Sequence, residues 1–336
     1  MPNASPRVLE SFKQPGKTTN PYISMLFDAL RAACVTKPFS WREALTGDFN
    51  VFHVHWPEIL LYSDRRSRRV GRRVAFWLLL QRMKFRRVAV VRTMHNLKPH
   101  ETPSKIDTRL LAKLDSITTA WIRLNPVTEP DESADVTTIL LGHYLDWFEE
   151  IPAVEPTPGL IGNFGLIRPY KGVPELVSAM RSSGDPNLSL VVMGAPSSAE
   201  LADEITKLAG SDPRITLELT HVDDATLARE VRRCSVVALP HHNMHNSSSL
   251  LLALSLDRPA LVPNTPVTRH IQAEVGPEWV YLYESLDAEA LEAAARRATD
   301  EPRAEHPDLS QREWKQVAAA HIAVFDRALA AAQMAD

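Results

Sequence analysis

The sequence predicts an α/β protein with two domains, each built on a parallel β-sheet covered by helices. Its 336 residues exceed what a single hydrophobic core usually organises. Short apolar runs typical of buried strands alternate with segments of helical periodicity through most of the chain, and this alternation indicates parallel sheets. A Pro-rich segment at 151–158 (IPAVEPTP) interrupts the alternation, which restarts after it. We therefore expect one domain at residues 1–150, a second at 159–309, and a cleft between them.

The net charge of −3 conceals two halves of opposite sign. Residues 1–150 carry six more Lys and Arg than Asp and Glu, whereas residues 151–336 carry nine fewer. This asymmetry indicates different partners for the two halves. The sequence has no apolar run of membrane-spanning length, no apolar signal region at its start, and two widely separated cysteines. We expect a cytoplasmic protein.

The first half opens with a strand, a loop and a helix. Arg7–Phe12 (RVLESF) reads as a buried strand, and Tyr22–Cys34 carries apolar residues at helical spacing. Asn20 before Pro21 is typical of a helix N-cap followed by proline at the first helical position. In doubly wound folds the loop between such a strand and helix meets the ligand. Further strands are expected at 51–56, 87–94, 117–124 and 137–141, and a helix at 106–114.

The segment from Ser63 to Arg87 is unusually basic. The 23 residues from Arg65 to Arg87 hold ten Lys and Arg, no acid, and an apolar centre at 74–80. Three interpretations compete: a solvated basic helix, an amphipathic helix at an anionic membrane surface, and a nucleic-acid footprint. Because no nucleic-acid-binding module accompanies the segment, we expect no nucleic-acid partner and weigh the membrane surface against the solvated helix.

The second half repeats the strand–helix alternation regularly. Strands are expected at 160–164, 188–193, 215–219, 236–239, 260–262 and 280–283. Helices are expected between them, at 173–182, 198–208, 224–234, 247–256, 268–275 and 287–299, followed by a long helix at 309–331.

A turn bounded by glycines, Gly162–Gly172, is the strongest candidate for anion binding. Arg168 and Lys171 lie in it, between an apolar strand and a helical pattern. Arginine can fork two hydrogen bonds to phosphate oxygens, lysine supplies a point charge, and a helix start adds backbone N–H groups. We assign Arg168, Lys171 and Gly165 to a phosphate group.

A second anion-seeking turn follows the strand at 236–239. Its Ser247, Ser248 and Ser249 begin a helix, where hydroxyls and free N–H groups occur together. Two such turns in one domain fit a diphosphate. Metal binding by His241, His242 and His245 is a weaker alternative, because no cysteine or acid accompanies them.

Histidines mark the expected ligand side of the first half. His95 directly follows the strand at 87–94 and has His100 and Glu101 nearby. A histidine in such a loop can hydrogen-bond a substrate hydroxyl or move a proton. His53 and His55 alternate on a strand and so share a face. A zinc site there is conceivable, but a hydrogen-bonded or acceptor-facing pair is favoured.

At this point the sequence resembles the bacterial GT-B glycosyltransferases of the family 4 type, along essentially its whole length. The resemblance lies in FGLIRPYKGVPELVSAM (164–180), LSLVVMG (188–194), VVALPHHNMHNSSSLLLALSLDRPALVPN (236–264), TMHN (93–96) and WKQVAAAHIAVFDRAL (314–329). The motifs GKTTNPY, HVHWPE and HNLKPHE look like a subgroup that builds exopolysaccharides and glycolipids, some members of which use GDP-mannose.

The resemblance implies two Rossmann-like domains facing across a cleft, with residues 310–336 crossing back to the first domain. It implies that the second domain binds a nucleotide sugar, either GDP-mannose or a UDP-sugar, through Arg168 and Lys171, and that His95 lies near the donor sugar. We expect sugar transfer to a hydroxyl of a glycan or lipid-linked acceptor, without metal or cofactor. The donor sugar and nucleotide would contact Asn243, His245, Asn246, Gly194 and His221. The acceptor side would comprise Lys17, Thr18, Thr19, Asn20, Tyr22, His53, His55 and His100.

The sequence departs from the resemblance at one place. Retaining members usually carry Glu-x7-Glu after the strand equivalent to 236–239, whereas residues 241–256 contain no acid. The stereochemical outcome is therefore open. If the reaction inverts, Glu101 or Glu58 is the expected general base; if it retains, His95 orients the donor sugar. A sugar-nucleotide epimerase of the same fold and a non-catalytic sugar-nucleotide-binding protein are the alternatives.

Overall fold

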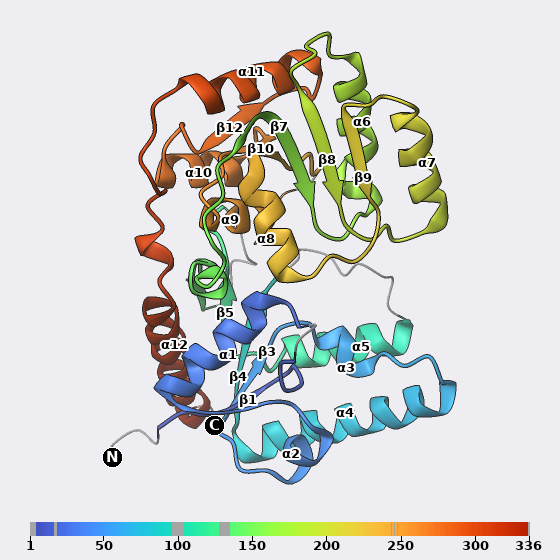
Figure 1. The fold of residues 1–336 in the computed structure, drawn as a ribbon. Helices are drawn as coiled ribbons and strands as arrows, with labels where there is room; N and C mark the ends of the chain where they lie inside the picture. Colours follow the sequence, from blue (N-terminus) through green and yellow to red (C-terminus); the bar gives the residue numbers. More distant parts are fainter. Residues whose placement is uncertain are drawn as a thin grey trace. The chain divides into compact units, whose positions relative to one another are not determined.

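The protein is described by a computed structural model over residues 5–16, 19–95, 104–127, 135–242, 244, 246 and 248–334. Contacts divide the chain into two compact units (Figure 1). Unit 1 comprises Met1–Gly142 together with Gln311–Asp336, and unit 2 comprises His143–Ser310.

Unit 1 is built on a six-stranded sheet in which every strand pair is parallel, in the order β2-β1-β3-β4-β5-β6. Because the chain runs from β1 to β2 in one direction and onward from β3 in the other, the order of strands reverses between β1 and β3. The strands are β1 Arg7–Glu10, β2 Val35–Lys37, β3 Val51–Val54, β4 Ala89–Met94, β5 Ala120–Arg123 and β6 Val136–Thr138.

Helices enclose the core of this sheet. Helices α2, α3 and α5 pack around α4, and Phe52, Phe76 and Leu79 are fully buried in the core beneath them. Helix α12 packs against α1 and β4, as expected for a C-terminal helix that returns to the first domain. The helices are α1 Pro21–Ala33, α2 Trp41–Thr46, α3 Pro57–Leu61, α4 Arg66–Arg86, α5 Lys105–Asp115 and α12 Trp314–Met334.

Local signals explain where most of these elements begin. Asn20 accepts a hydrogen bond from the Tyr22 backbone N–H, and Pro21 occupies the first turn of α1, which confirms the expected cap. The short elements β2, α2 and α3 were not predicted. The final helix begins at Trp314 rather than at 309, because the 3₁₀ turn η3, Ser310–Arg312, precedes it.

Unit 2 has a second six-stranded parallel sheet, in the order β12-β11-β10-β7-β8-β9. Its strand order reverses between β7 and β10. The strands are β7 Thr157–Phe164, β8 Ser189–Met193, β9 Ile215–Glu218, β10 Cys234–Ala238, β11 Ala260–Pro263 and β12 Val280–Tyr283. Strand β7 starts inside the Pro-rich segment, three residues before the predicted start at 160.

Helices alternate with these strands, as the sequence predicts. Leu176, Val192 and Leu291 lie in the buried core that joins α6, β8 and α11. The helices are α6 Val173–Ser182, α7 Ala199–Ala209, α8 Asp224–Arg233, α9 Ser248–Ser255, α10 Pro266–Val275 and α11 Ala288–Asp300, with 3₁₀ turns η1 Asp146–Phe148 and η2 Pro169–Lys171.

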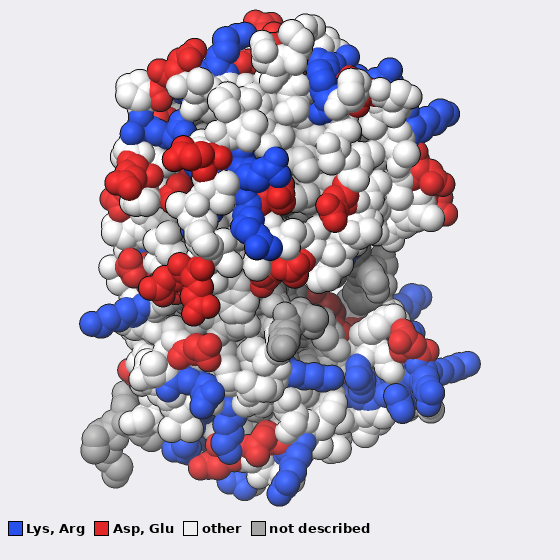
Figure 2. Space-filling model, viewed as in Figure 1, with Lys and Arg blue, Asp and Glu red and all other residues white. Residues whose placement is uncertain are grey.

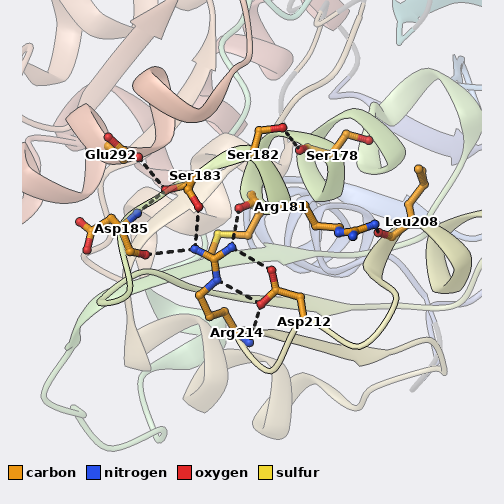
Figure 3. A network of polar contacts seen from close by, with 10 residues as sticks. Ser178, Arg181, Ser182, Ser183, Asp185, Leu208, Asp212, Arg214 and Glu292 are labelled. Atoms are coloured by element: carbon orange, nitrogen blue, oxygen red, sulfur yellow. Dashed lines mark hydrogen bonds and ion pairs between the residues drawn. The ribbon is translucent and has the colours of Figure 1, made fainter.

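A polar network links the segments at the amino-terminal ends of the strands in the unit 2 sheet (Figure 3). The Arg214 guanidinium, just before β9, donates to both Asp212 carboxylate oxygens and to the Ser183 and Asp185 carbonyls. The Ser183 hydroxyl donates in turn to Glu292 of α11. These contacts lie at the opposite end of the strands from the anion-seeking turns. We therefore infer that the network stabilises the fold of unit 2 and does not contact the ligand.

Candidate functional site

The two anion-seeking turns of unit 2 leave neighbouring strands at the point where the strand order reverses. Turn 162–172 begins in the last residues of β7, and the Pro240–Ser249 turn follows β10, which pairs with β7 in parallel. In doubly wound sheets, ligands bind outside the carboxyl ends of the strands at this switch point. The topology therefore brings the two turns together at the expected ligand position.

Glycines shape the first turn around Lys171. Gly165 and Gly172 have φ values of 97° and 65°, which L side chains rarely adopt. The Lys171 ammonium nitrogen lies 3.6 Å from where a Cβ on Gly165 would be, so it lies across the face of this glycine. Arg168 is exposed at the start of η2.

Three loops meet at this turn. The His242 backbone N–H donates to the Tyr170 carbonyl at 3.0 Å. A Cβ on Gly172 would lie 2.2 Å from the Pro240 carbonyl oxygen, and one on Gly194 would lie 1.9 Å from the Gly165 carbonyl oxygen. Only glycine permits such close backbone approaches, so the loops after β7, β8 and β10 form one packed unit.

The electrostatics of this packed unit favour an anion. Burial and then the charge of Arg168 lower the pKa of Lys171 to about 8. Burial and then the charge of Lys171 lower the pKa of His241 to about 3, so the imidazole is neutral. An anion bound at Lys171 and Arg168 would relieve their mutual repulsion and raise the pKa of Lys171.

Hydrogen bonds to other residues of unit 2 fix the start of α9. The Tyr144 hydroxyl hydrogen-bonds to the Ser248 side chain, and the Ser248 N–H donates to the Asn246 carbonyl at 3.1 Å. Ser248 and Ser249 are both half-buried. The assigned residues Asn243, His245 and Ser247 lie outside the described part of the chain. His221, after β9, is exposed.

Unit 1 has its own cluster at the place where its strand order reverses. Glu10 ends β1, His53 lies on the adjacent β3, and His55 follows that strand directly. All three are at least 97% buried. Glu10 was not singled out from the sequence, although a lone acid in an apolar strand could have drawn attention to it.

Hydrogen bonds connect this cluster into a chain. Glu10 Oε1 lies 3.2 Å from His53 Nδ1, and Glu10 Oε2 lies 3.2 Å from His55 Nε2. His55 Nδ1 lies 2.8 Å from Nε2 of His95, the residue after β4. On the other branch, His53 Nε2 lies 2.8 Å from the Thr93 hydroxyl. The four ionisable side chains thus belong to one hydrogen-bonded network.

Burial and neighbouring charges set the protonation of the network. Burial alone would raise the pKa of Glu10, but the charge and hydrogen bond of His53 and the hydrogen bond of His55 outweigh it and hold that pKa at about 2. Burial and then His53 lower the pKa of His55 to about 4. Burial and then His55 hold the pKa of His95 well below its usual value. At neutral pH, Glu10 is therefore anionic and His55 and His95 are neutral.

Glu10, His53 and His55 also bring donor atoms within 4.8 Å of one another, a group that could hold a metal ion. Their hydrogen bonds use the same atoms, at 3.1–3.2 Å. Hydrogen bonding within the cluster and binding of a metal ion would therefore use the same side-chain atoms.

The sequence assigned further residues to the acceptor side and to the general base. Some of them lie in unit 1 near this cluster or elsewhere in the unit, and the rest lie outside the described residues. Tyr22 is buried, with its ring edge-on to His95 at 5.7 Å between centroids. Thr19 accepts a hydrogen bond from the Gly16 N–H, and Glu58 lies half-buried in the first turn of α3. Outside the described residues lie Lys17, Thr18, His100 and Glu101.

Two doubly wound parallel-sheet units, the first completed by the C-terminal helix, constitute the GT-B fold of glycosyltransferases. Solved structures with this arrangement include HepE of Anabaena in complex with UDP, with a TM-score of 0.60, 12% identity and 97% of both chains covered. AviGT4, a glycosyltransferase of avilamycin A biosynthesis, has a TM-score of 0.61 and 14% identity over 97% of this chain and 98% of its own. The predicted fold class is confirmed.

Sequence relatives narrow the class. Two sequences named GDP-mannose:glycolipid 4-beta-D-mannosyltransferase, both from Xanthomonas campestris pv. campestris, are 42% identical to the chain over 329 residues, 97% of this chain and 94% of each relative. No protein-family model matches the chain. The chain belongs to the family of GT-B glycosyltransferases that contains these mannosyltransferases, which confirms the predicted enzyme class.

Proposed function

We propose that the protein transfers mannose from GDP-mannose to a hydroxyl of a glycolipid acceptor in glycolipid or exopolysaccharide synthesis. The observation that carries this proposal is the 42% identity to the Xanthomonas mannosyltransferases over nearly the whole chain. The packed loops around Lys171 support it, because they offer two cations to the diphosphate of a nucleotide sugar at the switch point of unit 2.

The relatives' name also bears on stereochemistry. GDP-mannose carries its sugar in the α configuration, and a 4-beta product inverts that configuration. Inversion proceeds by direct displacement and needs a base on the acceptor hydroxyl. It needs no carboxylate beneath the donor sugar, which fits the absence of acids from residues 241–256. We therefore favour the inverting reaction.

Unit 2 would supply electrostatic stabilisation. As the bond from the sugar to the diphosphate breaks, negative charge grows on the β-phosphate. Lys171 and Arg168 would stabilise that charge as fixed cations, with the Ser249 N–H at the start of α9 as a further donor. This arrangement needs no metal ion or other cofactor for the leaving group.

Transfer and nucleotide selectivity test the proposal together. We expect the purified protein to transfer mannose from GDP-mannose to a lipid-linked glycan, with activity unchanged by EDTA. GDP should raise the melting temperature more than UDP, because a ligand specific to the native state stabilises it by mass action. Conversion of the donor without an acceptor would instead indicate an epimerase. A melting temperature unmoved by any nucleoside diphosphate would contradict donor binding.

We further propose that α4 holds the protein at an anionic membrane surface, as a cytoplasmic protein at the inner face of the membrane. No described helix is long and apolar enough to cross a bilayer. Exposed apolar residues on α4 follow one another at spacings of four, three, one and seven residues, which places them on one face of the helix. They are Val70, Val74, Trp77, Leu78 and Phe85, the last of which is 86% exposed.

Basic residues border this apolar stripe. Figure 2 shows Lys and Arg side chains gathered along the α4 edge of unit 1. Arg66 and Lys84 lie on one side of the stripe and Arg68 and Arg86 on the other, and all four are exposed. An exposed apolar face with basic borders is the pattern of helices that lie in the interface of an anionic bilayer. A lipid-linked acceptor would be met at the same surface.

Vesicle binding tests the membrane role. Changing Arg66, Arg68, Lys84 and Arg86 together to glutamine should weaken binding to vesicles containing anionic phosphatidylglycerol at least tenfold, since each basic residue contributes about 1 kcal/mol near such a surface. The control variant, Lys207→Gln with Arg296→Gln, neutralises two exposed charges of unit 2 and should bind normally. Equal binding by both variants would reduce α4 to a solvated helix.

A further inference from the structure

We propose that Glu10, His53 and His55 form a zinc-binding site inside unit 1. His321 of α12 completes this site as the fourth ligand. The cations assigned to the leaving group belong to unit 2, so the proposal does not depend on the proposed function. It gives unit 1 a structural metal ion that takes no part in breaking the bond to the diphosphate.

Three of the four ligands already lie close to the spacing of donors around zinc. Tetrahedral zinc holds nitrogen and oxygen donors at about 2.0–2.1 Å, which places neighbouring donors about 3.3 Å apart. Glu10 Oε2 lies 3.1 Å from His53 Nδ1 and 3.2 Å from His55 Nε2. The donor atoms of the three residues all lie within 4.8 Å of one another. Both nitrogens therefore stand at ligand spacing from one carboxylate oxygen.

The chemistry of these donors suits zinc. Imidazole nitrogens with a carboxylate oxygen are ordinary zinc ligands, whereas magnesium and calcium prefer oxygen ligands throughout. The Glu10 carboxylate is anionic at neutral pH and offsets part of the charge that the ion brings. Glu10, His53 and His55 are 0%, 0% and 3% exposed, so bulk water does not compete for their donor atoms.

Each of the two strand histidines has a partner on the ring nitrogen that zinc would leave unbound. A histidine that binds a metal usually donates its other ring N–H to a nearby acceptor, which fixes the ring. His53 Nε2 lies 2.8 Å from the Thr93 hydroxyl, and His55 Nδ1 lies 2.8 Å from His95 Nε2. When zinc binds, the proton on each ring moves to this outer nitrogen, so the two neutral rings release no proton.

The fourth ligand comes from a buried nitrogen on α12. His321 is 0% exposed, and its Nε2 has no hydrogen-bond partner among the residues that the structure describes. Its Nδ1 donates to the Val317 carbonyl at 2.7 Å, so in the neutral ring Nε2 carries a lone pair. The His321 ring lies 5.4 Å from the His53 ring, between centroids. A buried acceptor without a partner costs stability, and zinc would satisfy it.

The four ligands belong to segments that are far apart in the sequence. Glu10 ends β1, His53 and His55 lie on and just after β3, and His321 lies on α12. Zinc would thus tie the C-terminal helix to the centre of the unit 1 sheet, and its binding energy would add to the stability of the fold. Removing zinc should lower the melting temperature, whereas sugar transfer by protein that remains folded should continue.

Metal content tests the site directly. Protein without an affinity tag, purified from zinc-supplemented medium, should contain about one zinc ion per chain by mass spectrometry of the metal. Stripping the zinc should lower the melting temperature, and adding zinc back should restore it. Protein that holds no zinc, and whose melting temperature does not respond to added zinc, would overturn the proposal.

Variants locate the ion. Glu10→Gln and His53→Gln each remove a ligand and should weaken zinc affinity by more than about 100-fold, measured by competition with a chromophoric chelator. Thr93→Val removes only the partner of a ligand and should weaken it about 10- to 100-fold. His241→Gln alters the alternative histidine cluster of unit 2 and should retain zinc. Loss of zinc in His241→Gln, with normal affinity in the first two variants, would overturn the proposal.

Cobalt tests the coordination without any substitution, in case a ligand variant fails to fold. Co²⁺ in place of zinc should show the intense visible bands of a four-coordinate site and no thiolate charge-transfer band. The weak bands of six-coordinate cobalt, or a thiolate band, would overturn the proposed ligand set. His321→Phe should weaken zinc affinity at least tenfold and change the cobalt spectrum; an unchanged affinity and spectrum would exclude His321 as the fourth ligand.

Discussion

Lys171→Ala is expected to lower kcat/KM for sugar transfer by about 10²- to 10³-fold, the usual cost of removing one preorganised donor to a developing negative charge. The effect should be large because the Lys171 ammonium group is partly desolvated, and the packed loops hold it across Gly165. Arg168→Ala should cause a smaller loss, since Arg168 is exposed and better solvated. Steady-state kinetics with GDP-mannose measure the loss of kcat/KM in each variant. Full activity in both variants would show that Lys171 and Arg168 do not bind the diphosphate.

The pH dependence of nucleotide binding gives this prediction a matched control. Because burial and then the charge of Arg168 lower the pKa of Lys171 to about 8, this side chain is increasingly neutral above that pH. Anion binding must then restore the proton, and GDP affinity should fall toward tenfold per pH unit above about pH 8. Lys171→Arg keeps its charge at every accessible pH and should abolish this fall. Calorimetry between pH 7 and 9.5 measures GDP affinity in the wild type and in Lys171→Arg. If affinity falls equally steeply with pH in both, a group other than Lys171 is responsible for the fall.

Much of the fold follows from the sequence because the relevant signals are local. Alternating apolar runs and helical segments define two doubly wound sheets, and the Asn20–Pro21 cap marks the start of α1. The missed elements β2, α2 and α3 contain three, six and five residues. Such short elements present less than two turns or two alternations of pattern, and contacts with the rest of the unit decide their structure.

The sequence predicted which residues belong to the candidate sites better than it predicted which of them contact one another. The sequence pointed to Lys171 and His95 because charged and polar residues after buried strands indicate a ligand edge. It did not connect His95 with Glu10, since 85 residues separate them along the chain and only the pairing of β1, β3 and β4 brings them together. Long-range register of this kind is not visible in one sequence.

Gly172→Ala is expected to uncouple the two anion-seeking turns, because this glycine combines an unusual backbone conformation with a close approach. A left-handed φ costs a non-glycine residue about 1–2 kcal/mol. The added Cβ would also lie 2.2 Å from the Pro240 carbonyl oxygen, so one loop must move. We expect the free energy of unfolding to drop by about 2–5 kcal/mol, the sum of strain and overpacking, and GDP affinity to fall at least tenfold.

Gly210→Ala isolates the first of these two causes, the unusual backbone conformation. Gly210, at the end of α7, also has a positive φ, of 57° with ψ at −131°, but an added Cβ would meet no atom closer than 3.8 Å. This variant should lose about 1–3 kcal/mol of stability from backbone strain alone and bind GDP normally. If the two variants bind GDP equally well, contact between Gly172 and Pro240 does not maintain the site. If only Gly172→Ala loses affinity, the diphosphate site depends on the packing of one turn against the other, which would explain why two cations of modest individual specificity can act as one binding group.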